Sequence, residues 1–223
     1  MKRKCAEAAF KMIREGMVVG LGGGETIQYL IEFIHMSGIK VKVVTPSAKT
    51  ALIAAQHELE IIPTWLCDHV DIAFDGCNEI DRQLLCLKSM GAIHTQEKII
   101  GSMADEYVIL APETRFFEHL SFDVPLTIEI MKDAYSCIMK KLFDLGFTAA
   151  PRSSKEKDGF VMSDNGNIIV DIDMRSVEDP VQANEMISAL YGVVDTSLFA
   201  NVVTKALIAS KEGIEIIEKK EAL

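Results

Sequence analysis

Two apolar patterns alternate along the first half of the chain. Short apolar runs predict buried strands, and apolar residues spaced three or four positions apart predict amphipathic helices. Strands that alternate with helices in this way are typical of the α/β class, a mostly parallel sheet with helices on both faces. We predict strands at 17–21, 41–44, 61–62, 70–74 and 107–111, and helices at 4–15, 27–34, 48–56 and 95–104.

Beyond Val124 the predicted elements no longer alternate one by one. Their order is β-α-β-β-α-β, which is the ferredoxin-like arrangement. The dipeptide Asn165-Gly166, between apolar residues, is a strong hairpin signal and joins the two central strands. The predicted elements are strand 125–130, helix 133–145, strands 160–162 and 168–171, helix 180–190 and strand 193–196.

Two further strands, 205–210 and 213–217, follow and are expected to return to the first sheet. We therefore predict two domains. Residues 1–123 and 201–223 are expected to form a Rossmann-like α/β domain, and residues 124–200 a smaller ferredoxin-like α+β domain.

Composition narrows the class of protein. The chain has 223 residues, 49% hydrophobic and 25% charged, which excludes a disordered or coiled-coil chain. The formal net charge of −10 disfavours nucleic acid and anionic membranes as partners, so any bound phosphate must be held locally. No signal-type apolar run follows the basic N-terminus, and the five cysteines are odd in number without a C-x-x-C pair. These features predict a cytoplasmic protein with unpaired thiols.

The first candidate site is the turn Gly22–Thr26, directly after a predicted strand. Glycines let the backbone approach an anion, and the following helix offers free N–H groups at its positive end. The same sequence also suits an ordinary tight turn. It matches neither the dinucleotide fingerprint nor the P-loop, so a nucleotide site is disfavoured.

The second candidate is the segment Asp75–Ile80, which follows the strand at 70–74. Ligands of open α/β sheets lie beyond the carboxyl ends of the strands, where Asp75 would present its carboxylate. A solvated acidic turn remains the alternative interpretation.

The third candidate is the segment 88–98. Thr95 is a plausible helix N-cap, with Glu97 in the first turn. Lys98 is expected to be a solvated helix lysine, and Lys88 lies before a flexible segment. The five histidines are scattered without ligand spacing, so we expect no metal site.

Taken together, these segments resemble the type A ribose-5-phosphate isomerase family over essentially the whole chain. The resemblance implies the two-domain architecture predicted above, a phosphorylated sugar as the small-molecule partner, and a homodimer or tetramer. It also implies a metal-free and cofactor-free interconversion of ribose 5-phosphate and ribulose 5-phosphate through a cis-enediol. The matching blocks are Val19–Gly22 with Gly24 and Thr26, Asp75-Gly76, Glu79-Ile80, Lys88, Gly91-Ala92, Thr95, Glu97–Ile100, Pro125-Leu126, Asp164–Asn167 and Leu198–Asn201.

The resemblance assigns roles to individual residues. The base of the family falls on Glu97, which would move a proton between C1 and C2 of the sugar. Lys88 would stabilise the enediolate oxygen, and Asp75 would hold hydroxyls and help to open the ring. The phosphate would lie at the Gly22–Thr26 turn, with Lys2 or Arg115 nearby. The expected substrate-binding residues are Gly22, Gly23, Gly24, Glu25, Thr26, Asp75, Gly76, Asn78, Lys88, Ser89, Met90, Gly91 and Arg115.

This chain departs from the family pattern at the same site. In the family loop G-T-G-S-T, Gly23 and Glu25 stand in place of the first two of three hydroxyl residues, and Asn78 replaces a second aspartate. Ser89 and Met90 replace glycines, and Arg115 replaces a lysine. Two alternatives therefore stay open: a divergent relative that isomerises another sugar phosphate, and a sugar-phosphate-binding protein without catalytic activity.

Overall fold

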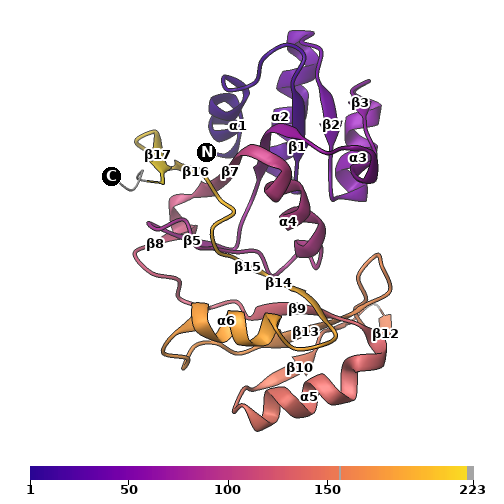
Figure 1. Cartoon of the computed structure of the whole chain (residues 1–223). Helices are drawn as coiled ribbons and strands as arrows, with labels where there is room; N and C mark the ends of the chain where they lie inside the picture. Colours follow the sequence, from indigo (N-terminus) through magenta and orange to yellow (C-terminus); the bar gives the residue numbers. More distant parts are fainter. Residues whose placement is uncertain (156, 220–223) are drawn as a thin grey trace.

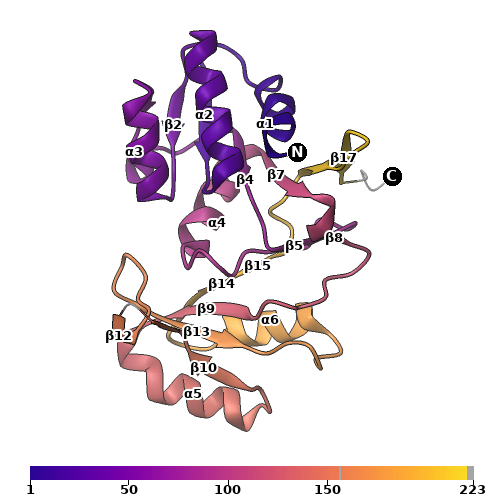
Figure 2. The ribbon, with the colours of Figure 1, turned by 180° about the vertical axis from the view of Figure 1, so that it is seen from behind.

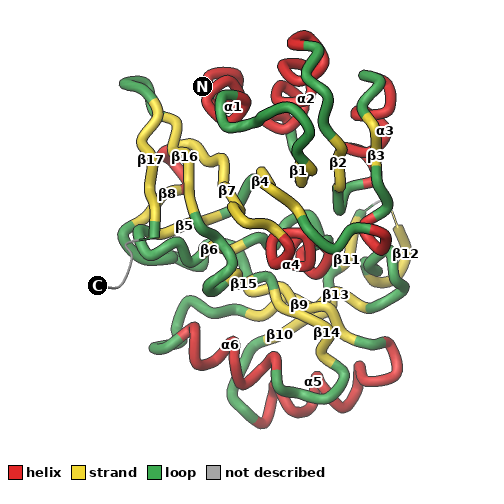
Figure 3. The backbone as a smooth tube through the Cα atoms, turned by 45° about the horizontal axis from the view of Figure 1, so that its top comes forward, coloured by secondary structure: helices red, strands yellow, loops and turns green. Residues whose placement is uncertain are grey.

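A computed structural model describes residues 1–155 and 157–219. In this part of the chain, seven strands form a mostly parallel sheet of the α/β class. Figure 1 shows this sheet in the upper part of the molecule, and Figure 3 labels all its strands, whose order is β17-β16-β7-β4-β1-β2-β3. Neighbouring strands are parallel except for the antiparallel pair β16 and β17, so the predicted return of the tail to this sheet is confirmed. The strands are β1 (Val18–Leu21), β2 (Lys42–Val44), β3 (Glu60–Ile61), β4 (Val70–Asp75), β7 (Ala104–Pro112), β16 (Lys205–Ala209) and β17 (Ile214–Glu218).

Helices cover both faces of this sheet. The apolar sides of α1 (Lys2–Phe10), α2 (Glu25–Ser37) and α3 (Ala48–Gln56) pack into one core cluster with the sheet. Helix α4 (His94–Met103) buries Ile100 in a separate cluster on the other face. Helix α1 ends at Phe10, well before the predicted end at residue 15. There the backbone N–H groups of Met12 and Ile13 bond three residues back, which tightens the chain into a turn.

The strand order places a ligand crevice next to β1. Strands β2 and β3 lie on one side of β1, and the next strands of this sheet along the chain, β4 and β7, lie on its other side. Ligands of such doubly wound sheets bind beyond the carboxyl ends of the strands at this switch point. Gly20 allows β1 and β4 to lie close together here, because a Cβ at that position would meet the Cβ of Ala73 at 2.6 Å.

A second, antiparallel sheet lies beyond α4, and within the described residues its order is β10-β13-β9-β14 (Figure 2). Alternate residues of β9 face opposite ways. Ile128 and Ile130 pack against the helices α5 and α6, whereas Glu129 reaches Thr95 of α4. The elements are β9 (Leu126–Ile130), α5 (Tyr135–Asp144), β10 (Ala149–Pro151), β13 (Ile168–Ile172), α6 (Pro180–Ser188) and β14 (Val193–Thr196).

The hairpin predicted between 160–162 and β13 is confirmed only at a single bridge, because β13 has a longer partner on that side. That partner is β10, whose sequence Ala149-Ala150-Pro151 has low strand propensity and lies at an edge of the sheet, where proline is tolerated. Met162 forms only a single bridge with Ile168, across the predicted turn, in which the N–H of Gly166 donates to the carbonyl of Ser163 at 2.9 Å. Nearby, β11 (Ser153–Ser154) pairs with β12 (Lys157–Phe160).

Four very short strands, unpredicted from the sequence, form another sheet in the described ranges (Figure 3). Two or three residues are too few to show a strand periodicity. Across this sheet the backbone N–H of Lys88 donates to the carbonyl of Ser197 at 3.0 Å. The strands are β5 (Glu79–Asp81), β6 (Cys86–Leu87), β8 (Phe116–Phe117) and β15 (Leu198–Phe199). The 3₁₀ turns among the described residues are η1 (Thr64–Leu66), η2 (Glu113–Arg115) and η3 (Lys132–Ala134).

The helices in the described part of the chain are short. None of them is both long enough and apolar enough to cross a bilayer.

Candidate active site

Asp75 is the last residue of β4, and its buried carboxylate lies against the glycine turn after β1. Asp75 Oδ1 accepts from the N–H groups of Gly76 at 2.7 Å and Gly23 at 3.3 Å. Its Oδ2 accepts from the hydroxyl of Tyr107 at 3.1 Å. A Cβ at Gly22 would meet Asp75 Cγ at 2.0 Å, so only glycine leaves room for the carboxylate at this position.

Lys88 connects Asp75 to Glu97. Its Nζ lies 3.1 Å from Asp75 Oδ2 and 3.3 Å from Glu97 Oε1, and it donates to the backbone carbonyl of Gly76. Lys88 is 6% exposed and Glu97 is 7% exposed. The three residues predicted to be catalytic therefore meet in one buried cluster, brought there by β4, the segment after β6, and α4.

Burial and charge together set the protonation of this cluster. Burial and the neighbouring Asp75 raise the pKa of Glu97 to about 8, although Lys88 opposes this shift. Burial by itself would lower the pKa of Lys88, but Asp75 and Glu97 outweigh it and hold that pKa above its ordinary value. Burial, followed by the charge of Asp75, raises the pKa of Tyr107 well above 10. Glu97 thus gains and loses a proton near neutral pH beside a permanent cation.

The backbone after Lys88 is held from two sides. Asn78 Oδ1 accepts from the N–H groups of Ser89 at 2.9 Å and Met90 at 3.1 Å. Ser89 is fully buried, and its hydroxyl donates to the carbonyl of Pro125 at 2.5 Å. The side chain of Met90 is exposed. Asn78 therefore supports the loop that carries Lys88, while the Ser89 hydroxyl is engaged by Pro125 and the Met90 side chain is exposed to solvent.

A cavity of about 390 Å³ opens over the cluster, a size typical of small-molecule sites. Within the described residues, its lining does not include the predicted Gly22, Glu25, Thr26, Ser89 and Met90. Nine of its lining residues were predicted from the sequence: Gly23, Gly24, Asp75, Gly76, Asn78, Lys88, Gly91, Glu97 and Arg115.

Sequence reasoning missed four lining residues, namely Ser47, Ala48, Cys77 and Ile93. Ser47 follows β2 and caps α3 by accepting from the N–H of Thr50 at 3.2 Å. The hydroxyl of Thr50 in turn donates to the carbonyl of Gly22 at 2.8 Å. The rule that ligands lie beyond strand carboxyl ends, applied to β2 as well as β4, would have found Ser47.

A second cavity, of about 290 Å³, shares Gly23, Gly24 and Arg115 with the first and is also lined by Thr26. Lys2 and Glu25 form an ion pair at its edge, and the hydroxyl of Tyr29 donates to Glu25 Oε1 at 3.3 Å. The hydrogen bond from Lys2 holds the pKa of Glu25 below its usual value. A lysine expected to attract phosphate is therefore already paired with a carboxylate of this chain.

Helix α4 differs from its prediction in two ways. It begins at His94, after Ile93, so Thr95 is not its N-cap; the hydroxyl of Thr95 instead donates to Glu129 Oε2 at 2.5 Å. Lys98 is not solvated, because its Nζ contacts Asp195 of β14 at 2.7 Å. Neither partner could be seen from the local sequence, since both belong to the second sheet.

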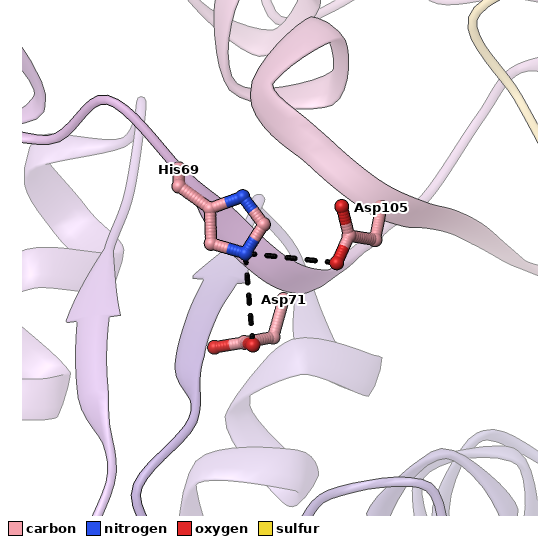
Figure 4. A group of neighbouring side chains, drawn as sticks. All are labelled: His69, Asp71 and Asp105. Atoms are coloured by element: carbon pink, nitrogen blue, oxygen red, sulfur yellow. Dashed lines mark ion pairs between the residues drawn. The ribbon is translucent and has the colours of Figure 1, made fainter.

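At the opposite end of the sheet, His69, Asp71 and Asp105 form a group with potential metal-ligand atoms (Figure 4). The Nε2 atom of His69 lies 3.7 Å from Asp71 and 3.6 Å from Asp105, and these side chains are largely exposed. Asp71 and Asp75 are four residues apart on β4, about 13 Å at the rise of a strand. These contacts lie at the amino ends of β4 and β7, remote from the cavity.

Comparison with known proteins identifies the family. The model of ribose 5-phosphate isomerase A (phosphoriboisomerase A) matches residues 42–213. Ribose-5-phosphate isomerase A of Methanocaldococcus jannaschii is 34% identical over 224 residues, which cover 98% of each chain, and that of Pyrococcus horikoshii is 32% identical over 227 residues with the same coverage.

Solved structures agree with the sequence matches. The structure of the M. jannaschii protein superposes with a TM-score of 0.90 at 33% identity, over 98% of both chains. A D-ribose-5-phosphate isomerase in complex with phospho-erythronic acid gives a TM-score of 0.90 at 31% identity, over 97% of both chains. The chain therefore belongs to the ribose-5-phosphate isomerase A family.

Proposed function

We propose that this chain interconverts ribose 5-phosphate and ribulose 5-phosphate, with Glu97 as the base. The observation that carries this proposal is the buried cluster of Asp75, Lys88 and Glu97 beneath a cavity of about 390 Å³. A carboxyl group whose pKa is about 8 can both accept and return a proton near neutral pH, which aldose–ketose isomerisation requires.

In the proposed reaction, Glu97 removes the proton from C2 of the open-chain aldose. The C–H electron pair forms the C1=C2 double bond, and the former carbonyl oxygen on C1 becomes the oxyanion of the enediolate. Lys88 donates to that oxyanion in a site largely closed to water, where such a donor is most effective. Glu97 then returns its proton to C1, while the hydroxyl proton on O2 passes to O1 and leaves a ketone at C2.

Asp75 is proposed to hold the sugar hydroxyls and to assist ring opening. Its carboxylate is fixed by the amides of Gly23 and Gly76 and by Tyr107, which supports a role in orienting the substrate. The phosphate is proposed to lie at the Gly22–Thr26 turn and the first turn of α2, whose free N–H groups attract anions. Arg115 lines both cavities, which supports a place for its cation between the sugar and the phosphate.

The division into domains and the oligomeric state are proposed on the basis of the same family assignment. We propose that residues 1–123 with 201–223 form a Rossmann-like domain and residues 124–200 a ferredoxin-like domain. We also propose a cytoplasmic homodimer or tetramer that associates through the smaller domain. The exposed apolar side chains of Phe143 and Tyr191, in or next to the helices of that domain, support such an interface.

Mixing the purified chain with ribose 5-phosphate in the presence of EDTA tests the function. We expect ketose to form at an undiminished rate, because the proposed proton transfer uses side chains only. Abolition of turnover by the chelator would rule out the metal-free mechanism. Pentose and hexose phosphates assayed in parallel separate the two alternatives: conversion of another sugar phosphate would identify a divergent isomerase, and thermal stabilisation without conversion would identify a binding protein.

Replacing Glu25 by serine is expected to tighten phosphate binding. The change removes a carboxylate from Lys2 at the edge of the second cavity and leaves that ammonium free for the substrate. We expect KM for ribose 5-phosphate to fall by about two- to fivefold, the modest scale of exposed charge interactions. Glu32→Gln, which removes a similar exposed pair with Arg3 from the same helix, is the matched control. An unchanged or higher KM would show that Glu25 does not compete with phosphate.

A further inference from the structure

Lys98 follows the proposed base in α4, and its ammonium group lies on the second sheet. Its Nζ donates to Asp195 Oδ1 at 2.7 Å and to the backbone carbonyl of Thr196 at 2.6 Å. Both acceptors belong to β14, and the side chains of Lys98 and Asp195 are each 21% exposed. The residue next to Glu97 therefore attaches α4 to a strand of another sheet.

The same turn of α4 makes other polar contacts with that sheet. The hydroxyl of Thr95 donates to Glu129 Oε2, and Glu129 Oε1 in turn accepts from Ser163 at 2.6 Å. The Nε2 atom of buried His94 lies 3.4 Å from the carbonyl oxygen of Asp195. Helix α4 itself lies between the two sheets (Figures 1 and 2). Its orientation is therefore set by polar side chains of β9 and β14 as well as by apolar packing.

Lys98 also shares an aromatic ring with the catalytic cluster. Its Nζ lies 5.0 Å from the ring centroid of Phe199, and the Nζ of Lys88 lies 5.8 Å from the same centroid. Phe199 in turn stacks on Tyr107, whose hydroxyl donates to Asp75. A displacement of Lys98 would therefore change the packing around Phe199, the ring that also contacts Lys88 and Tyr107.

A contribution to the stability of the fold does not explain the ion pair between Lys98 and Asp195. Burial lowers the pKa of Lys98, although Asp195 opposes this shift, so the charged form of the lysine is costly at this position. Buried ion pairs contribute little net stability, because the loss of hydration offsets their attraction. Specifying one geometry is the best-attested use of such groups.

We propose that Lys98 and Asp195 form a positioning pair that fixes the Glu97 carboxylate relative to Lys88 and the reacting carbons. This inference rests on the proposed role of Glu97 as the base. In the described residues, neither member of the pair lines the cavity over the cluster, so both act through Glu97. A base displaced by about 1 Å loses rate while the substrate contacts stay in place.

Lys98→Met, Asp195→Leu and the double variant test the pair. We expect Lys98→Met to lower kcat for ribose 5-phosphate by about 10- to 100-fold, with KM changed by less than about twofold. It also leaves Asp195 half-buried without its cation, so the denaturation midpoint falls; the double variant restores the midpoint without restoring kcat. Lys140→Met, which removes an exposed pair with Asp144, is the matched control and keeps both values.

Two results would overturn the proposal. One is a Lys98→Met enzyme with the kcat of the wild type, and the other is a double variant in which turnover recovers together with stability, as for a purely structural pair. Turnover of the wild type in the same assay tests the proposed function separately.

A second measurement does not depend on turnover. The structure places the pKa of Glu97 at about 8 in the wild type, and carbon NMR of the labelled carboxyl group would measure it in each variant. We expect Lys98→Met to lower it by about one unit, because a carboxylate released from its fixed place gains water. An unchanged pKa would contradict a positioning role.

Discussion

Glu97→Gln is expected to lower kcat for ribose 5-phosphate by about 10³-fold, because the amide cannot accept the C2 proton. KM should change little, since glutamine has the shape of the protonated acid and the phosphate contacts lie elsewhere. Steady-state rates of ketose formation measure both constants. Glu118→Gln is the matched control, because it removes an exposed carboxylate whose partner is Arg82. A Glu97→Gln enzyme with most of the wild-type rate would exclude Glu97 as the base.

The pH dependence of the wild type tests the same assignment. The base must be ionised, so kcat/KM should rise about tenfold per pH unit up to the pKa of Glu97, about 8, and then level off. The remaining activity of Glu97→Gln should lack this rise. A wild-type profile that is flat between pH 6 and 9, a range of about three units around that pKa, would contradict the assignment.

The free energy of unfolding should depend on pH in the opposite direction to the activity, because ionisation of Glu97 activates the enzyme but destabilises the fold. The folded pKa of Glu97 lies above the ordinary value of 4.5, so the folded state binds the proton more tightly than the unfolded chain does. The stabilisation that results is complete below pH 4.5 and is lost as the pH rises to about 8. The wild type should therefore lose stability relative to Glu97→Gln across this range, which denaturant titrations at several pH values would measure.

Lys88→Met is expected to be the second most damaging change. Removing the donor to the enediolate oxygen should lower kcat by about 10²- to 10³-fold. The variant also removes the cation 3.3 Å from Glu97 Oε1, which lowers the pKa of that carboxyl group in the wild type. The rising limb of the kcat/KM profile should therefore move to higher pH.

Lys42→Met is the matched control, because it removes an exposed lysine whose Nζ lies 4.0 Å from Glu60 Oε1. This variant should keep the wild-type rate and profile. A Lys88→Met enzyme that loses rate without any shift of its profile would separate Lys88 from the protonation of Glu97.

The alternation of apolar runs and helical spacing determined the seven-stranded sheet and the helices on its two faces. This pattern is local, because burial on one face repeats every two residues in a strand and every 3.6 in a helix. Short motifs marked the segments that hold Asp75, Lys88 and Glu97, and the family resemblance of those segments identified the three residues as catalytic candidates. The residue types, the place of Asp75 at the end of a strand and the place of Glu97 in the first turn of a helix are properties of the sequence alone.

Tertiary structure decided what these residues touch. In the sequence, Asn78 stands out only as the loss of a family aspartate, yet in the structure its side chain supports the backbone of the loop that carries Lys88. Lys98 reads as a solvated lysine, yet its partner Asp195 lies 97 residues away along the chain. The raised pKa of Glu97 also comes from burial and from Asp75, which belongs to another element. Contacts between distant segments leave no periodicity in either segment, so local patterns reveal the candidates, and only the packing of the two sheets around α4 sets their charge and geometry.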